Sequence, residues 1–150
     1  MRIKTKIKVK NLSENELPFF ATEGSSGFDL RSNEEQTIES GDYKVIGTGL
    51  YFEIPDGFEV QIRSRSGLAA KHGVCVLNSP GTIDSDYTGE IKIILINHGK
   101  ESFKINKGDR IAQGVLSQSF CSKNLTFEVI SELQKETVRN DNGFGSTGVN

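Results

Sequence analysis

The chain has 150 residues, 35% of them hydrophobic and 25% charged, which predicts one globular domain with its own hydrophobic core. Its 18 basic and 20 acidic residues give a net charge of −2, which argues against a general nucleic-acid or membrane binder, because such proteins carry a basic excess. This composition leaves open a small anionic ligand that is held by a few local cations.

The first ten residues alternate between two kinds of side chain. Ile3, Thr5, Ile7 and Val9 fall on one side of an extended chain, and the basic residues between them fall on the other. A period of two predicts a half-buried strand with a basic, solvated outer face. A binding role for that face is the alternative.

Short strand-like segments separated by turn residues fill most of the remaining chain. The expected strands are residues 28–31, 43–46, 50–54, 58–62, 74–77, 90–97, 103–105, 111–116 and 127–130. Short strands at spacings of roughly 8–12 residues predict an all-β sandwich, barrel or jelly roll. Residues 68–72, which follow Ser66 and Gly67, are the only segment that we expect to form a short helix.

The end of the chain has a different composition. From Arg139 it reads RNDNGFGSTGVN, which cannot bury enough apolar surface to fold by itself, so a frayed terminus is one interpretation. The other is a binding segment, because glycine amides, hydroxyls and a guanidinium suit phosphate, and the Phe144 ring suits stacking on a base. We therefore expect a β domain over residues 1–138 and a flexible glycine-rich lid over residues 139–150.

Two features bear on the compartment. Cys75 and Cys121 lie far apart, and two cysteines make a poor disulfide framework for a chain of this length, so we expect reduced, mostly buried thiols and a cytoplasmic protein. A single disulfide is the alternative. The basic start has no apolar segment typical of a secretory signal, and the longest apolar run, residues 93–96, is too short to span a bilayer.

The most informative segment is GTIDSDYTGEI, residues 81–91, which places Asp84, Asp86 and Glu90 around Tyr87. Such a density of acids beside an apolar strand costs repulsion and desolvation, and it therefore needs an explanation. A solvated turn is the simple one. A catalytic role for one of the acids is the other.

Five segments decide between these interpretations by their order: GFDLRS, RSRSGLA, NSPGTIDSDYTGEI, GDRIAQ and RNDNGFGSTG. Over residues 24–148 they closely resemble the motifs of the trimeric dUTP pyrophosphatase (dUTPase) family. The resemblance implies an all-β, jelly-roll-like distorted barrel with one short helix, forming a homotrimer with exchanged C-terminal arms. It also implies hydrolysis of dUTP to dUMP and pyrophosphate, which keeps uracil out of DNA and supplies dUMP for thymidylate synthesis.

The resemblance implies roles for single residues. Asp84 would position or activate the water that attacks the α-phosphorus, whereas Asp86 would make structural hydrogen bonds. Tyr87 would exclude a 2′-hydroxyl, and Asn78 would bind uracil. Asp29 would steady hydrated Mg²⁺, the implied cofactor, through water.

The remaining implied residues bind substrate from two places in the chain. Those within the body that would meet phosphate are Arg65, Ser66, Gly67 and Gln113. Those in the lid are Arg139 for the γ-phosphate, Phe144 for uracil, and Gly145, Ser146 and Thr147.

Four positions depart from the family pattern. Ser64 stands where proline is common, and Phe28 where tyrosine is common. Asn140 and Asn142 replace small residues or glycines, a change that we expect to affect lid closure rather than the activity itself.

Two other functions stay open on the sequence. A dCTP deaminase has the same fold, and Glu90 would have to serve as its proton shuttle; release of ammonia from dCTP would identify it. A non-catalytic β trimer that binds nucleotides or a protein partner would be expected to lack Asp84 or the lid, and both are present.

Overall fold

The computed structural model of the chain describes residues 5–121, 123–133 and 135–138. Within them it has ten strands and one helix. The elements are β1 (Lys8–Asn11), β2 (Phe28–Arg31), β3 (Gln36–Ile38), β4 (Tyr43–Glu53), β5 (Phe58–Arg63), α1 (Ser66–His72), β6 (Val74–Val76), β7 (Gly81–Ile83), β8 (Glu90–Asn97), β9 (Phe103–Ile105) and β10 (Arg110–Gln118).

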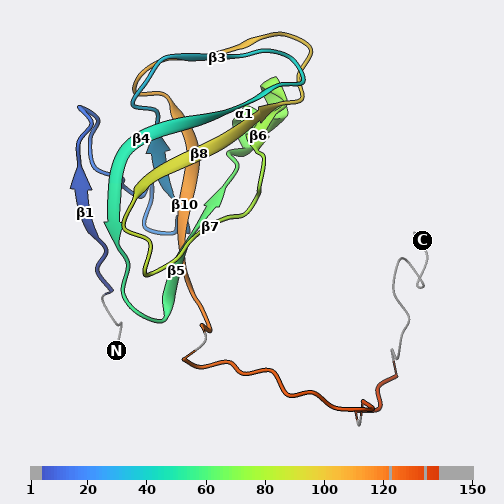
Figure 1. Ribbon diagram of the computed structural model, residues 1–150. Helices are drawn as coiled ribbons and strands as arrows, with labels where there is room; N and C mark the ends of the chain where they lie inside the picture. Colours follow the sequence, from blue (N-terminus) through green and yellow to red (C-terminus); the bar gives the residue numbers. More distant parts are fainter. Residues whose placement is uncertain (1–4, 122, 134, 139–150) are drawn as a thin grey trace.

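Two four-stranded antiparallel sheets form the body of the molecule. Their strand orders are β1-β4-β8-β6 and β2-β10-β5-β7, and β3 and β9 form a small separate pair. In Figure 1 the long β4 and β8 run side by side in front of β10. The expected all-β class with one short helix is confirmed.

The hydrophobic core contains residues from both sheets. In β8, Ile91, Ile93 and Leu95 are fully buried and alternate with more accessible residues, as one buried strand face requires. They belong to one cluster with Leu30 of β2 and Val60 of β5. The core therefore holds together the two sheets whose edges and ends carry the polar residues described below.

Most expected strands are confirmed, and residues 28–31, 90–97 and 103–105 have the expected bounds. The expected strands 43–46 and 50–54 are instead one strand, β4, which is interrupted by a register shift between Gly47 and Tyr51. Glu90 holds this irregularity, because its Oε1 accepts the Gly49 N–H at 3.0 Å. The three-residue strands β3 and β7 were not expected.

One expected strand is wrong. Residues 127–130 pair with no other strand of the described chain, and Phe127 and Val129 are 92% and 99% exposed. A β-strand requires a neighbouring strand to which its backbone can hydrogen-bond. This segment has none among the described residues, because the chain leaves the body after β10 (Figure 1). The N-terminal strand was also expected too early, since β1 begins at Lys8.

The helix α1 begins two residues earlier than expected, at Ser66, and ends where Gly73 takes a left-handed conformation with φ 68°. The Gly73 N–H donates to the Ala69 carbonyl, and a Cβ at this position would lie 2.7 Å from the backbone nitrogen of Gly99. Both the conformation and the close approach therefore require glycine.

The two thiols are free, as expected, but they are not both buried. Cys75 is half-buried in β6, whereas Cys121 is exposed because it lies where the chain has left the second sheet. The described part of the chain contains no helix with the length and hydropathy needed to cross a lipid bilayer.

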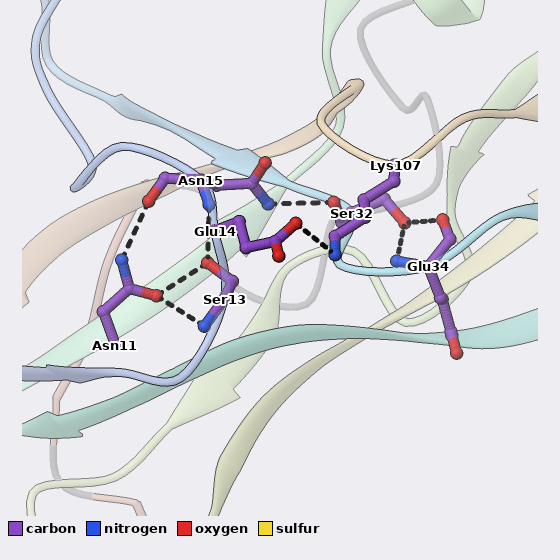
Figure 2. A network of polar contacts seen from close by, with 7 residues as sticks. All are labelled: Asn11, Ser13, Glu14, Asn15, Ser32, Glu34 and Lys107. Atoms are coloured by element: carbon purple, nitrogen blue, oxygen red, sulfur yellow. Dashed lines mark hydrogen bonds and ion pairs between the residues drawn. The ribbon is translucent and has the colours of Figure 1, made fainter.

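A polar network attaches the loop after β1 to the rest of the body (Figure 2). The Asn15 side chain donates to the Ser32 carbonyl at 3.0 Å, and the Asn11 side chain donates to the Asn15 carbonyl at 2.9 Å. Glu14 pairs with Lys107 at 2.8 Å. These contacts hold the start of the segment that continues to Gly27 and the pocket.

Candidate active site

A polar pocket of about 360 Å³ lies where segments from β2, the β5–α1 turn and β10 meet. Five of the residues expected to bind substrate or metal line it together. Its lining consists of Ala21, Ser25, Ser26, Gly27, Asp29, Arg65, Ser66, Gly67, Arg110 and Gln113.

The strand register explains why these residues meet. β10 lies between β2 and β5, and Gln113 pairs with Asp29 on one side and with Arg63 on the other. Directly after Arg63 the chain turns through Ser64 and Arg65 into α1. One position of the central strand therefore brings three distant parts of the sequence to the same place.

Asp29 lies between two arginines in this pocket. Its Oδ1 is 3.2 Å from Arg65 Nε, and its Oδ2 is 3.2 Å from Arg110 Nη1. The Asp29 side chain is only 16% exposed, so both cations compensate a carboxylate that is largely removed from water. Arg65 Nη1 also donates to the Arg110 carbonyl at 2.9 Å, which joins the two arginines.

Gln113 is held by the backbone around it. Its Nε2 donates to the Ser64 carbonyl at 2.9 Å, and a Cβ added at Gly27 would lie 2.5 Å from its Oε1. Gly27 therefore leaves the space that this amide fills. The Ser64 hydroxyl accepts the Val76 N–H at 2.9 Å, so the residue that departs from the family pattern ties the pocket turn to β6.

The second group of expected residues, Asn78, Asp84 and Tyr87, does not line this pocket. In the pairing of β5 with β7, Ile83 lies opposite Val60, so Asp84 follows at the far end of β5 from Arg65. At about 3.3 Å per residue this separation along the strand is roughly 10 Å or more. Within one chain Asp84 therefore lies away from Arg65, whereas Asn78 lies beside Gly81, which pairs with Ile62 near the α1 end of β5.

Asp84 and Asn78 are exposed, and Asp84 makes no side-chain hydrogen bond or ion pair with another described residue. Its carbonyl accepts the Tyr87 N–H at 3.1 Å, so the acids sit on a tight turn. The solvated-turn interpretation thus describes the backbone correctly. The side-chain hydrogen bonds expected from Asp86 are absent among the described residues.

Tyr87 has a defined orientation. Its hydroxyl donates to the Glu90 carbonyl at 2.9 Å, and its ring lies over Gly89, where a Cβ would meet the hydroxyl oxygen at 2.5 Å. The side chain is nevertheless largely accessible, with the residue 44% exposed. It offers a fixed aromatic face to a ligand or to another chain.

The expected site residues did not include half of the pocket lining, namely Ala21, Ser25, Ser26, Gly27 and Arg110. Arg110 is the charged residue among these five. It stands in the segment GDRIAQ beside a turn, so a basic residue near the expected Gln113 was the available signal. The expected lid residues Arg139, Phe144, Gly145, Ser146 and Thr147 lie outside the described residues.

The pocket contains oxygen donors of the kind that Mg²⁺ prefers. No cluster of three or more metal-ligating side chains occurs among the residues that the structure describes. Asp29 provides one carboxylate in a pocket that also offers hydroxyls and an amide. This set fits a Mg²⁺ ion that keeps most of its waters and is held largely by phosphate oxygens, rather than an all-protein site.

The fold and the pocket define an all-β protein with a preformed polar site for an anionic ligand. The family model described as dUTPase matches residues 13–148. The chain belongs to the dUTPase family, and the resemblance inferred from its five motifs is confirmed.

Two relatives named deoxyuridine 5'-triphosphate nucleotidohydrolase are each 53% identical to the chain. The one from Nautilia profundicola aligns over 144 residues, 95% of this chain and 99% of the relative. The one from Helicobacter hepaticus aligns over 146 residues, 95% of this chain and 89% of the relative.

Solved structures agree with the fold. A mutant dUTPase of Staphylococcus bacteriophage 80alpha with dUpNHpp matches with a TM-score of 0.87 and 25% identity, covering 97% of this chain and 100% of that one. A mutant dUTPase of phage phi11 of S. aureus, whose structure concerns the coordination of a structural Mg(II) ion, has a TM-score of 0.78 and 24% identity over 87% of this chain and 99% of that one.

Proposed function

We propose that this chain hydrolyses dUTP to dUMP and pyrophosphate by Mg²⁺-assisted attack of water on the α-phosphorus. The observation that carries the proposal is the pocket in which Asp29, Arg65, Ser66, Gly67 and Gln113 converge. The names of the relatives and the dUpNHpp of the bacteriophage 80alpha enzyme support the substrate. In the cell this activity would keep uracil out of DNA and supply dUMP for thymidylate synthesis.

In this proposal the pocket binds the triphosphate. The Ser66 hydroxyl, the Gly67 amide and the Gln113 side chain donate hydrogen bonds to phosphate oxygens, and Arg65 contributes positive charge. Asp29 holds Mg²⁺ through water. When bound, Mg²⁺ gathers the phosphate oxygens and neutralises charge that develops in the transition state.

Asp84, Asn78 and Tyr87 then act in the pocket of another subunit. Asp84 positions the attacking water, Asn78 reads uracil, and Tyr87 packs against the deoxyribose and leaves no room for a 2′-hydroxyl. The separation of Asp84 from Arg65 along β5 supports this arrangement. We therefore propose a homotrimer whose active sites lie at subunit contacts.

Exchange of the C-terminal arm is the second part of this assembly. The described part of this arm comprises residues 123–133 and 135–138. In it, the exposed fractions of Phe127, Val129 and Leu133 are 92%, 99% and 89%. The body has an open apolar groove of about 350 Å³ beside β1, lined by Thr5, Ile7, Val9, Leu17, Pro18, Phe20, Phe28, Phe52 and Leu116. Both surfaces would be removed from water if the arm packed on a neighbouring chain.

We further propose that residues 139–150 form a lid that orders only when substrate binds, over a β domain of residues 1–138. Arg139, Ser146 and Thr147 would contact phosphate, with Gly145 beside them, and Phe144 would stack on uracil. The substrate is a small molecule, with no nucleic-acid or membrane partner, and the enzyme works in the cytoplasm. The free Cys75 and Cys121 support a reducing compartment.

A pyrophosphate-release assay with dUTP, dCTP, dTTP and UTP, each with and without Mg²⁺, tests the function. We expect release from dUTP with Mg²⁺ and little from the other three. Ammonia from dCTP would instead identify a deaminase. Tight nucleotide binding without any turnover would identify a binding protein.

A further inference from the structure

We propose that Arg110, which is paired with Asp29, is the pocket cation that moves to bind the substrate phosphates, while Arg65 remains as scaffold. The inference rests on the proposed function, because it names how that site holds a triphosphate. It changes the role of Arg65 and adds a residue that the sequence did not single out.

Arg65 has little freedom to leave its place. Its Nε is paired with Asp29 and its Nη1 donates to the Arg110 carbonyl at 2.9 Å, so two different guanidinium nitrogens are already engaged. Its side chain is 27% exposed. A movement of Arg65 toward a ligand would break both contacts.

Arg110 is held by one contact. Among the described residues its guanidinium bonds only to Asp29, through Nη1 at 3.2 Å, and its side chain is 46% exposed. A guanidinium carries five N–H donors, so most of them face solvent in the pocket. Arg31, its strand partner, does not line the pocket and donates instead to the Gly108 carbonyl at 2.8 Å.

The backbone gives Arg110 its direction. The pairing of β10 with β2 shifts register between Arg110 and Ala112, so Ile111 is the extra residue of a bulge. A bulge turns the side chains beside it away from the regular alternation. Ile111 is 1% exposed and points into the core, which leaves Arg110 over the pocket.

Arrival of a triphosphate makes the exchange favourable. Phosphate oxygens accept two parallel bonds from a guanidinium, whereas Asp29 now accepts one bond from Arg110. When Arg110 leaves, Asp29 stays paired with Arg65, so the carboxylate is never left without a cation. Its Oδ2 is then free for the hydrated cation that accompanies the nucleotide.

Binding of dUpNHpp and of dUMP to Arg110→Gln, measured by calorimetry, tests this assignment. Loss of a charge-assisted contact predicts about 10- to 100-fold weaker dUpNHpp binding, with dUMP affinity within about twofold of the unmodified protein. Arg63→Gln is the matched control, since Arg63 has the same charge, bonds to Gln61 and does not line the pocket. We expect no change for this control.

Equal dUpNHpp affinity in Arg110→Gln and the unmodified protein would overturn the proposal, as would an equal loss of dUpNHpp and dUMP. If Arg110→Gln does not fold, Arg110→Lys keeps the charge but not the fork, and unchanged dUpNHpp binding there overturns it. If the unmodified protein releases no pyrophosphate from dUTP, the proposed function has failed. Inorganic tripolyphosphate binding to the two proteins then still tests Arg110.

Discussion

The phosphate pocket and the turn after β7 differ in how far one chain completes them. In the pocket, Asp29, Arg65 and Gln113 are fixed by ion pairs and hydrogen bonds to other parts of the same chain. Beside β7, Asp84 after the strand and Asn78 before it are both exposed. The contrast fits the proposed homotrimer, in which one subunit would anchor the triphosphate and a neighbouring subunit would supply the residues proposed for chemistry and base recognition.

Removing the proposed catalytic acid should give the largest effect. Asp84→Asn keeps the size of the side chain but loses the charge that orients the water, so we expect turnover to fall roughly 10²–10⁴-fold. Binding of dUpNHpp should remain near normal. Stopped-flow pyrophosphate release and calorimetry measure the two quantities.

Asp86→Asn is the matched control, because Asp86 is exposed on the same turn. We expect its turnover to stay within about threefold of the unmodified enzyme, since no reacting group is removed. Near-normal turnover of Asp84→Asn, or equal losses in both variants, would contradict the role of Asp84.

Deleting residues 139–150 tests the lid. The body should keep its fold and its trimeric mass in light scattering, because the core lies within the two sheets. Loss of base stacking and of phosphate contacts predicts a kcat/KM about 100-fold lower. Full activity of the shortened chain would show that the pocket and the turn suffice without a lid.

A smaller effect is expected from a substitution that moves the Gln113 amide but leaves the charged residues of the pocket unchanged. In Gly27→Ala the new Cβ would lie 2.5 Å from Gln113 Oε1 and would displace that flexible amide. Loss of one hydrogen bond predicts roughly fivefold weaker dUpNHpp binding with little change in thermal stability. Gly24→Ala is the control, since no atom lies within 4 Å of its Cβ position; equal affinities in both variants would remove Gln113 from phosphate binding.

The smallest effect concerns the exposed contact that holds the loop before the pocket. Lys107 bonds to Glu14 and lowers the pKa of that carboxyl. Because the folded-state pKa lies below the unfolded one, the stabilisation is present above the unfolded pKa and is lost as pH falls through the folded pKa. In Lys107→Gln the Glu14 pKa should return to its usual range in an NMR titration, with little change in thermal stability. An unmoved pKa would show that another group sets it.

The sequence predicted the all-β class because buried and more accessible residues alternate along β8 and β2. A strand with one face on the core requires this period of two. The prediction of individual strands was wrong where the same local pattern is compatible with two different structures. Residues 127–130 have the composition of a strand but no partner in this chain. The two segments of β4 look separate in sequence, whereas Glu90, which lies far along the chain, holds them in one strand.

The order of five motifs sufficed to identify the family and five of the residues that line the pocket, because glycines, acids and arginines at those spacings are rarely combined for another reason. Only the tertiary structure decided that Arg110 joins them, that Ser64 ties the turn to β6, and that Asp84 lies away from Arg65. These depend on strand register and on a bulge. Such features are set by contacts between residues distant in sequence, which no local pattern records.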